Sequence, residues 1–115
     1  MTVCIRIGQL QSVQLPGTTT FNYALLLLLQ CLPSAKVLAD LKIMDAGEHE
    51  ANLAFEAGAD IVTVLGVAHD ETIQGVVRAA RRAGGGIKEV MVDLINTSNP
   101  AARAKEVAEL GVDIV

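Results

Sequence analysis

The 115-residue sequence is poor in aromatic residues, with one Tyr, two Phe and no Trp. It also lacks a run of apolar residues long enough to cross a bilayer, because the stretch at 24–32 is short and is interrupted by Gln30. The first residues have neither the charged region nor the cleavage site of a secretory signal peptide. These absences predict a protein with no membrane segment.

Cysteine and positive charge are scarce as well. Cys4 and Cys31 are isolated and have no metal-ligand spacing, which predicts buried, reduced thiols and a cytoplasmic location. The formal net charge is −4 and no basic stripe is present, so no nucleic-acid partner is expected. An acidic protein can still bind a phosphorylated sugar, because backbone N–H groups can hold the phosphate.

Apolar residues make up 51% of the chain, and from residue 36 onward short apolar runs alternate with helical patterns. Three candidate N-caps, Asp45, Asp70 and Asn99, precede the helical patterns, and Glu48 completes a capping-box spacing with Asp45. The pattern predicts buried strands at 37–42, 59–66 and 90–95 and a further strand that begins at 112.

A short repeat marks the end of two helices. The segment Gly-Ala-Asp-Ile-Val at 58–62 is echoed by Gly-Val-Asp-Ile-Val at 111–115. Helices that alternate with buried strands through short connections predict a parallel α/β sheet. Such a sheet is either open and doubly wound or a (β/α)8 TIM barrel. No Gly-x-Gly-x-x-Gly motif supports a dinucleotide fold.

A complete barrel needs about 200 residues or more. We therefore expect a partial (β/α)8 TIM barrel, about half of one, in which residues 36–115 form the central βα units. Residues 1–35 are interpreted as a divergent N-terminal segment with a strand at 3–8 and a buried helix at 21–32.

Charged residues at the end of the first clear strand are the main candidates for chemistry. Asp40 and Lys42 are two residues apart, so on a strand they project from the same face, and Asp45 follows just beyond. Lys42 between carboxylates would be held protonated and could stabilise a developing negative charge. The same residues are also compatible with a structural ion pair and a helix cap, and the residues alone leave both interpretations open.

The carboxyl ends of parallel strands meet at one edge, which is where barrel enzymes hold their active sites. Asp93 ends the strand at 90–95, and His69 lies in the loop after the strand at 59–66. Both are therefore candidate substrate-binding residues at the edge that carries Asp40 and Lys42. Arg6 is a further candidate for this edge.

The Asp-x-Lys-x-x-Asp pattern resembles the signature of the orotidine 5'-monophosphate decarboxylase superfamily. The run ADLKIMDAG at 39–47 is most similar to its 3-hexulose-6-phosphate synthase branch, as are AFEAGADIVTVLG, VMVDLIN and AKEVAELGVDIV. The resemblance implies a (β/α)8-barrel homodimer. It also implies a Mg²⁺-dependent lyase that condenses formaldehyde with D-ribulose 5-phosphate.

The same resemblance assigns roles by position. Asp40 would be a catalytic residue that binds metal or substrate, and Lys42 an acid/base that stabilises the enediolate. Asp45 would be catalytic across the dimer interface, and Asp93 would lie near the substrate. The sequence departs from the family at Arg6, where family members carry a metal-binding Glu.

Two other functions stay open. The family's active-site His and phosphate loops have no counterpart in these 115 residues, so a single copy is expected to be inactive or impaired. The chain could instead be a lyase of the 3-keto-L-gulonate-6-phosphate decarboxylase type. It could also be a non-catalytic barrel fragment that self-associates through an open sheet edge.

Overall fold

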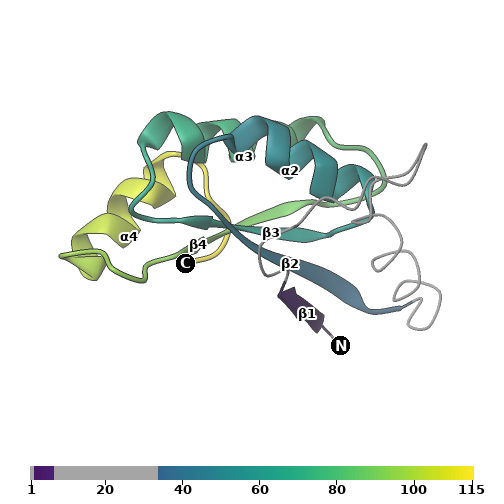
Figure 1. Ribbon diagram of the computed structural model, residues 1–115, viewed down its shortest axis with the longest axis horizontal. Helices are drawn as coiled ribbons and strands as arrows, with labels where there is room; N and C mark the ends of the chain where they lie inside the picture. The colour runs from purple at the N-terminus through teal and green to yellow at the C-terminus, as the bar shows by residue number, and fades with distance from the viewer. Residues whose placement is uncertain (1, 7–33) are drawn as a thin grey trace.

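A computed structural model describes residues 2–6 and 34–115 of the chain. The described strands form a single parallel sheet in the order β1-β2-β3-β4 (Figure 1). The strands are β1 (Thr2–Arg6), β2 (Lys36–Ile43), β3 (Ile61–Leu65) and β4 (Glu89–Asp93). The helices are α2 (Gly47–Glu56), α3 (Asp70–Arg82) and α4 (Pro100–Glu109). The strands predicted at 37–42, 59–66 and 90–95 and the helices that follow them are confirmed to within a few residues. The helix expected at 21–32 lies outside the described residues.

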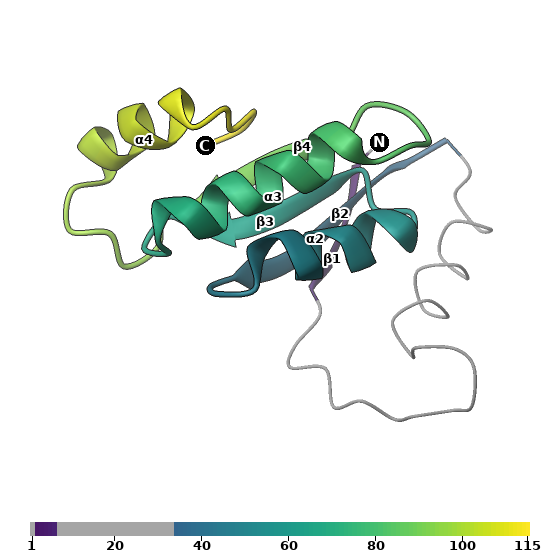
Figure 2. The same ribbon diagram turned by 90° about the horizontal axis from the view of Figure 1, so that it is seen from above.

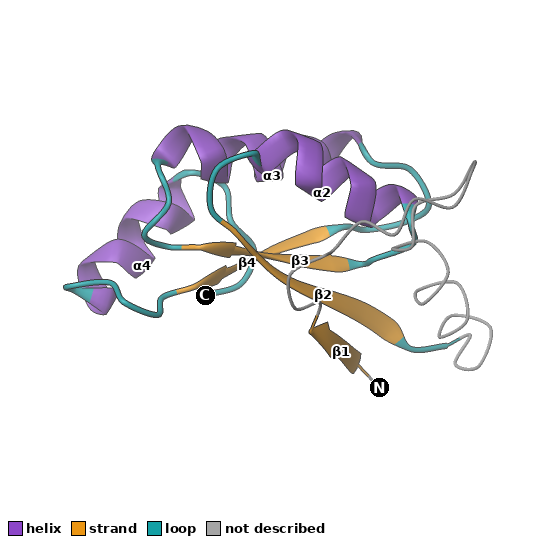
Figure 3. Ribbon diagram, in the orientation of Figure 1, coloured by secondary structure: helices purple, strands orange, loops and turns teal. Residues whose placement is uncertain are grey.

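The strand order favours a barrel over a doubly wound sheet. Each strand lies beside the next one in sequence, whereas a doubly wound sheet reverses its order at a switch point. Helices α2 and α3 lie side by side over one face of the sheet (Figures 2 and 3). No described helix covers the opposite face, which is the face that a closed barrel turns inward. The described residues therefore form an arc of a (β/α) barrel, as expected.

Small branched side chains make the contact between sheet and helices. Buried side chains of β2, β3 and β4 pack against α2 and α3, whose own buried side chains are alanines with Phe55, Ile73 and Val76. This packing needs little volume per side chain, which explains why a chain with so few aromatic residues can still bury a core. The fully covered residues include Ala39, Val62, Val64, Val90, Ala51, Ala54, Ile73, Val76 and Ala79.

The two covering helices approach closely at their amino-terminal ends. A Cβ atom on Gly47 would lie 2.2 Å from the backbone oxygen of Thr72, and one on Gly75 would lie 3.0 Å from the backbone nitrogen of Glu48. The contact is extended by ion pairs from Glu48 to Arg78 at 3.1 Å and to Arg82 at 2.7 Å. Glycine at position 47 therefore sets the distance between α2 and α3.

The repeated Gly-x-Asp-Ile-Val segments form the same structure twice at the amino-terminal edge of the sheet. Gly58 and Gly111 both have positive φ angles, 104° and 92°, and each ends a helix. Asp60 then accepts a hydrogen bond from the backbone N–H of Val37 at 2.9 Å. Asp113 does the same for Val90 at 2.8 Å. Each aspartate thus joins the start of one strand to its neighbour.

A cation completes each of these junctions. Lys88, which is buried, lies 3.2 Å from Asp60, and the Arg81 guanidinium binds both carboxylate oxygens of Asp113 at 2.8 and 3.1 Å. Beyond the second junction Ile114 bridges Met91 in parallel. Of the further strand predicted from residue 112, the structure shows this single bridge at Ile114 and not a strand.

One of the three predicted helix caps is confirmed. The Asn99 side chain accepts a hydrogen bond from the backbone N–H of Ala102 at 3.1 Å, with Pro100 as the first helical residue. Asp45 does not cap α2, because the helix begins two residues later, at Gly47. The Asp45 carboxylate instead accepts a hydrogen bond from the N–H of Ala46 at 2.7 Å. Asp70 does not cap α3 either, because its carboxylate binds Arg103 instead.

Two expectations from composition have different outcomes. Cys4 is a free thiol, but it is exposed on β1 and not buried, because no described element covers it on that edge strand. Cys31 lies outside the described residues. None of the described helices combines the length and apolar character needed to cross a membrane.

The close approach of α2 and α3 predicts that Gly47→Ala destabilises the fold by about 1–3 kcal/mol, because the added methyl group meets backbone that cannot move aside. Gly84→Ala is the matched control, since nothing lies within 4 Å of its Cβ position. Urea unfolding measures both. Equal stability of the two variants would contradict the packing described here.

Candidate active site

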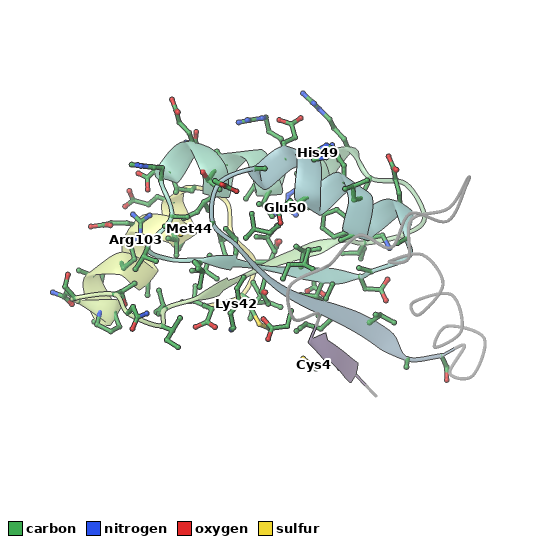
Figure 4. The ribbon with its side chains drawn as sticks, viewed as in Figure 1. Cys4, Lys42, Met44, His49, Glu50 and Arg103 are labelled. Atoms are coloured by element: carbon green, nitrogen blue, oxygen red, sulfur yellow. The ribbon has the colours of Figure 1, made fainter. Side chains whose placement is uncertain are left out.

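Three charged side chains converge at the carboxyl-terminal edge of the sheet. The ammonium group of Lys42 lies 3.3 Å from Oδ1 of Asp40 and forms an ion pair with Oδ2 of Asp93. Asp40 and Lys42 come from β2, and Asp93 is the last residue of β4. Lys42 lies on the face of the sheet turned away from α2 and α3 (Figure 4). We call Asp40, Lys42 and Asp93 the lysine cluster.

An irregularity in β2 places Lys42 in this cluster. Ala39 pairs with Val62 and Ile43 with Val64, so β2 carries extra residues between two paired positions. Lys42 itself has a φ of 51°, a left-handed conformation that costs a non-glycine residue about 1 kcal/mol or more. The regular alternation of a strand predicted that Asp40 and Lys42 share a face. They do converge, but through this irregularity.

Thr63 of β3 supports the irregular backbone. Its hydroxyl accepts a hydrogen bond from the backbone N–H of Lys42 at 2.9 Å and donates one to Oδ1 of Asp40, also at 2.9 Å. Thr63 is 3% exposed and Asp40 is 8% exposed, so the bond between them is buried, whereas the bond from the Lys42 N–H is partly buried. Nothing in the sequence pattern distinguishes Thr63, because threonine is ordinary in a β-strand.

The cluster favours the charged forms of its members. The hydrogen bond to Asp93, followed by that to Asp40, raises the pKa of Lys42 above its ordinary value, although partial burial opposes the shift. The hydrogen bond from Lys42, followed by one from the backbone N–H of Ile95, lowers the pKa of Asp93. Lys42 is therefore a cation, and Asp93 an anion, throughout the neutral range.

Asp45 lies apart from the lysine cluster. It is exposed, and its charge acts instead on Glu50 of α2, whose pKa is raised by burial and then by repulsion from Asp45. No hydrogen bond or ion pair among the described residues joins Asp45 to Lys42. The structure thus leaves Asp45 accessible at the same edge of the sheet.

His69 lies in a groove beside the lysine cluster. It is exposed at the residue before α3 and borders a cavity of about 890 Å³ between the loops after β3 and β4. We call this cavity the rim groove; it is lined by residues 66–71 and 96–99 with Ala102, Arg103 and Glu106. Since no member of the lysine cluster lines it, the structure brings Asp93 to Lys42 but places His69 elsewhere on the rim.

Arg103 organises the rim groove and was not selected from the sequence. Its guanidinium donates to the backbone oxygens of Gly66 and Ala68 at 2.7 and 3.2 Å, and it binds Asp70 at 2.7 Å and Glu106 at 2.9 Å. The bonds to Glu106 and then Asp70 raise the pKa of Arg103, although burial opposes the shift. Because Asp70 is 33 residues away in sequence, helical periodicity gives no sign of this contact.

Asp40 is a suitable but incomplete ligand for a divalent cation. Magnesium commonly takes one or two carboxylates and fills its octahedral shell with water and substrate oxygens. Among the described residues, no group of three or more His, Cys, Asp or Glu side chains is arranged to hold a metal ion.

Arg6 pairs with Asp40 in the β1–β2 register, so the backbone of Arg6 lies at this edge as expected.

A parallel sheet in which each strand lies beside the next in sequence, with Asp40, Lys42 and Asp93 gathered toward its carboxyl-terminal edge, is the arrangement of a (β/α) barrel. Within that class, the chain belongs to the orotidine 5'-phosphate decarboxylase / HUMPS family, whose model matches residues 14–115.

Known proteins of this family resemble the chain over most of its length. It is 51% identical over 86 residues to the 3-hexulose-6-phosphate synthase of Bacillus subtilis. The matched region covers 75% of this chain and 40% of that protein. The crystal structure of 3-hexulose-6-phosphate synthase from Salmonella typhimurium matches with a TM-score of 0.74 and 45% identity, over 81% of this chain and 43% of that one.

A related enzyme of different activity is less similar. The 3-keto-L-gulonate-6-phosphate decarboxylase from Vibrio cholerae matches with a TM-score of 0.64 and 31% identity, over 79% of this chain and 41% of that one. The chain spans about two fifths of the length of the curated relatives it matches.

The ion pair between Lys42 and Asp93 predicts a specific pH dependence of the free energy of unfolding. Because the pKa of Asp93 is lowered in the folded state, its contribution is present above the unfolded carboxyl pKa, near ~3.9, and is lost as the pH falls through the folded value. Because the pKa of Lys42 is raised, its contribution is lost only as the pH rises through a value above that of free lysine. Between these limits the pair contributes fully.

We therefore expect wild type to be more stable than Asp93→Asn at pH 7, by no more than about 1 kcal/mol because the pair is partly exposed. The difference should shrink as the pH falls below ~4. Urea unfolding at several pH values measures it. A difference that stays constant from pH 7 to pH 3 would contradict the assignment.

Proposed function

We propose that this chain carries the lysine-bearing part of a lyase active site that condenses formaldehyde with D-ribulose 5-phosphate, the activity that its resemblance to 3-hexulose-6-phosphate synthases implies. The observation that carries the proposal is the Lys42 ammonium group held between Asp40 and Asp93 at the strand ends. Identities of 51% and 45% to synthases, against 31% to the decarboxylase, support the synthase over the decarboxylase.

Lys42 supplies the acid and the electrostatic stabilisation in this proposal. Condensation requires a base elsewhere in the site to take a proton from the carbon next to the sugar carbonyl, and the negative charge that remains lies on the enediolate oxygens. A fixed ammonium group stabilises that charge, and it is most effective where water is partly excluded. The raised pKa of Lys42 keeps the ammonium group protonated. It can therefore also donate a proton to the formaldehyde oxygen as the new carbon–carbon bond forms.

Asp40 is proposed to bind Mg²⁺ or the substrate, with the remaining ligands supplied by water, by the sugar and by residues outside the described set. A bound Mg²⁺ ion would polarise the sugar carbonyl. The Asp40 carboxylate is oriented by its Oδ1 atom, which accepts a hydrogen bond from Thr63 and forms an ion pair with Lys42.

The remaining assignments concern substrate and partner. Asp93 is proposed to accept hydrogen bonds from the phosphorylated sugar, and His69 to contact it from the rim groove. Asp45 is proposed to act in the site of a second subunit of a homodimer, and its exposure supports a role that needs access. We place the reaction in the cytoplasm, in keeping with the free thiol of Cys4.

The experiment measures consumption of formaldehyde with ribulose 5-phosphate, with and without Mg²⁺, by wild type, Lys42→Ala and Lys105→Ala. Lys105 is an exposed lysine of α4 and serves as the charge-matched control. We expect Lys42→Ala to lose about 10²–10⁴-fold in rate and Lys105→Ala to match wild type.

Turnover that survives in Lys42→Ala would contradict the proposal. Release of CO₂ from 3-keto-L-gulonate 6-phosphate without consumption of formaldehyde would favour the decarboxylase. A folded chain that self-associates, turns over neither substrate and is unchanged by Mg²⁺ would favour a non-catalytic role.

A further inference from the structure

One buried hydroxyl group contacts both residues of β2 that belong to the lysine cluster. A threonine hydroxyl has one proton to donate and two lone pairs to accept with. The backbone N–H of Lys42 can only donate and the ionised Asp40 can only accept, so the direction of both bonds to Thr63 is fixed. Thr63 Oγ1 therefore links the Lys42 backbone to the Asp40 side chain.

The Lys42 backbone needs this partner because it does not follow the regular ladder. The pairing of β2 with β3 is interrupted between Ala39 and Ile43, and Lys42 has a left-handed backbone. Its N–H is directed to a side chain of β3, and a buried N–H without an acceptor is strongly disfavoured. The hydroxyl of Thr63 thus stabilises the one backbone conformation that directs Lys42 toward both carboxylates.

We propose that Thr63 is a positioning residue for the lysine cluster, which fixes the Lys42 backbone and the Asp40 carboxylate with a single hydroxyl group. The effect of Thr63 on turnover rests on the proposed function, whereas its effect on the Lys42 backbone does not. A hydroxyl that held only Asp40 would leave the lysine free to adopt a regular strand. By bonding to both residues, Thr63 sets the separation of the ammonium group from the carboxylate.

Two substitutions separate the hydroxyl group from the shape of the side chain. Thr63→Val keeps the branched shape that suits a strand but removes the donor and the acceptor. Thr63→Ser keeps the hydroxyl and removes the methyl group. Thr2→Val is the matched control, because Thr2 is an exposed strand threonine that pairs with Lys36 at the start of β1, at the edge of the sheet opposite the cluster.

The first readout is amide hydrogen exchange measured by NMR. We expect the Lys42 amide to exchange roughly tenfold faster in Thr63→Val than in wild type, with Thr63→Ser close to wild type. The amides of β3 and β4 should keep their wild-type rates. In wild type the Thr63 hydroxyl proton should exchange slowly and show a nuclear Overhauser effect to the Lys42 amide, a measurement that needs no variant to fold.

The second readout is turnover of formaldehyde and ribulose 5-phosphate. In Thr63→Val, kcat should fall by about 10²-fold with little change in KM, because a displaced catalytic group lowers the rate more than binding. Thr63→Ser should recover most of that loss, and Thr2→Val should match wild type.

Three results would overturn the proposal. These are a wild-type rate of Lys42 amide exchange in Thr63→Val, a uniform acceleration of all strand amides, and the absence of the hydroxyl contact in wild type. Faster exchange at Lys42 alone, in a chain with no turnover, would support the positioning role while the proposed function failed. The two failures are therefore distinguishable.

Discussion

The ammonium group of Lys42 lies between two carboxylates because the ladder between β2 and β3 is interrupted at that residue. A regular strand would place Lys42 in register with β3 and leave its N–H in the ladder. Instead the backbone turns through a positive φ and its N–H bonds to Thr63. Asp40, Lys42 and Asp93, from two strands that are not neighbours, then form one charged cluster. The candidate chemistry depends on this local departure from regular pairing.

The two edges of the sheet have different physical roles. At the amino-terminal edge, Asp60 and Asp113 each accept a backbone N–H from the neighbouring strand and each pair with a cation, so the strands are joined at their starting points. At the carboxyl-terminal edge, a positive φ and partly exposed charges are retained. This division is the general pattern of (β/α) barrels, in which one end supplies stability and the other supplies chemistry.

The sequence was sufficient for the elements that depend on local patterns. Apolar runs and glycine stops located β2, β3, β4 and their helices, and the rule that parallel strand ends share an edge brought Asp93 to Lys42. The interruption in β2 has no signature in the sequence, so Thr63 could not be distinguished from an ordinary strand residue. The predicted caps at Asp45 and Asp70 were wrong because tertiary contacts act at both positions. Helix α2 begins at Gly47, where it packs closely against Thr72, and the Asp70 carboxylate binds Arg103.

The same edge of the sheet therefore holds two polar sites, the lysine cluster and the rim groove, and the proposed chemistry requires the first. A titration of the isotopically labelled chain with ribulose 5-phosphate, followed by NMR amide shifts, separates them directly. We expect the largest shifts at Asp40, Lys42 and Asp93, and their loss in Lys42→Met. Shifts confined to the rim groove, around His69 and Thr97, and unchanged in Lys42→Met would show that the sugar phosphate binds away from the lysine and would contradict the assignment.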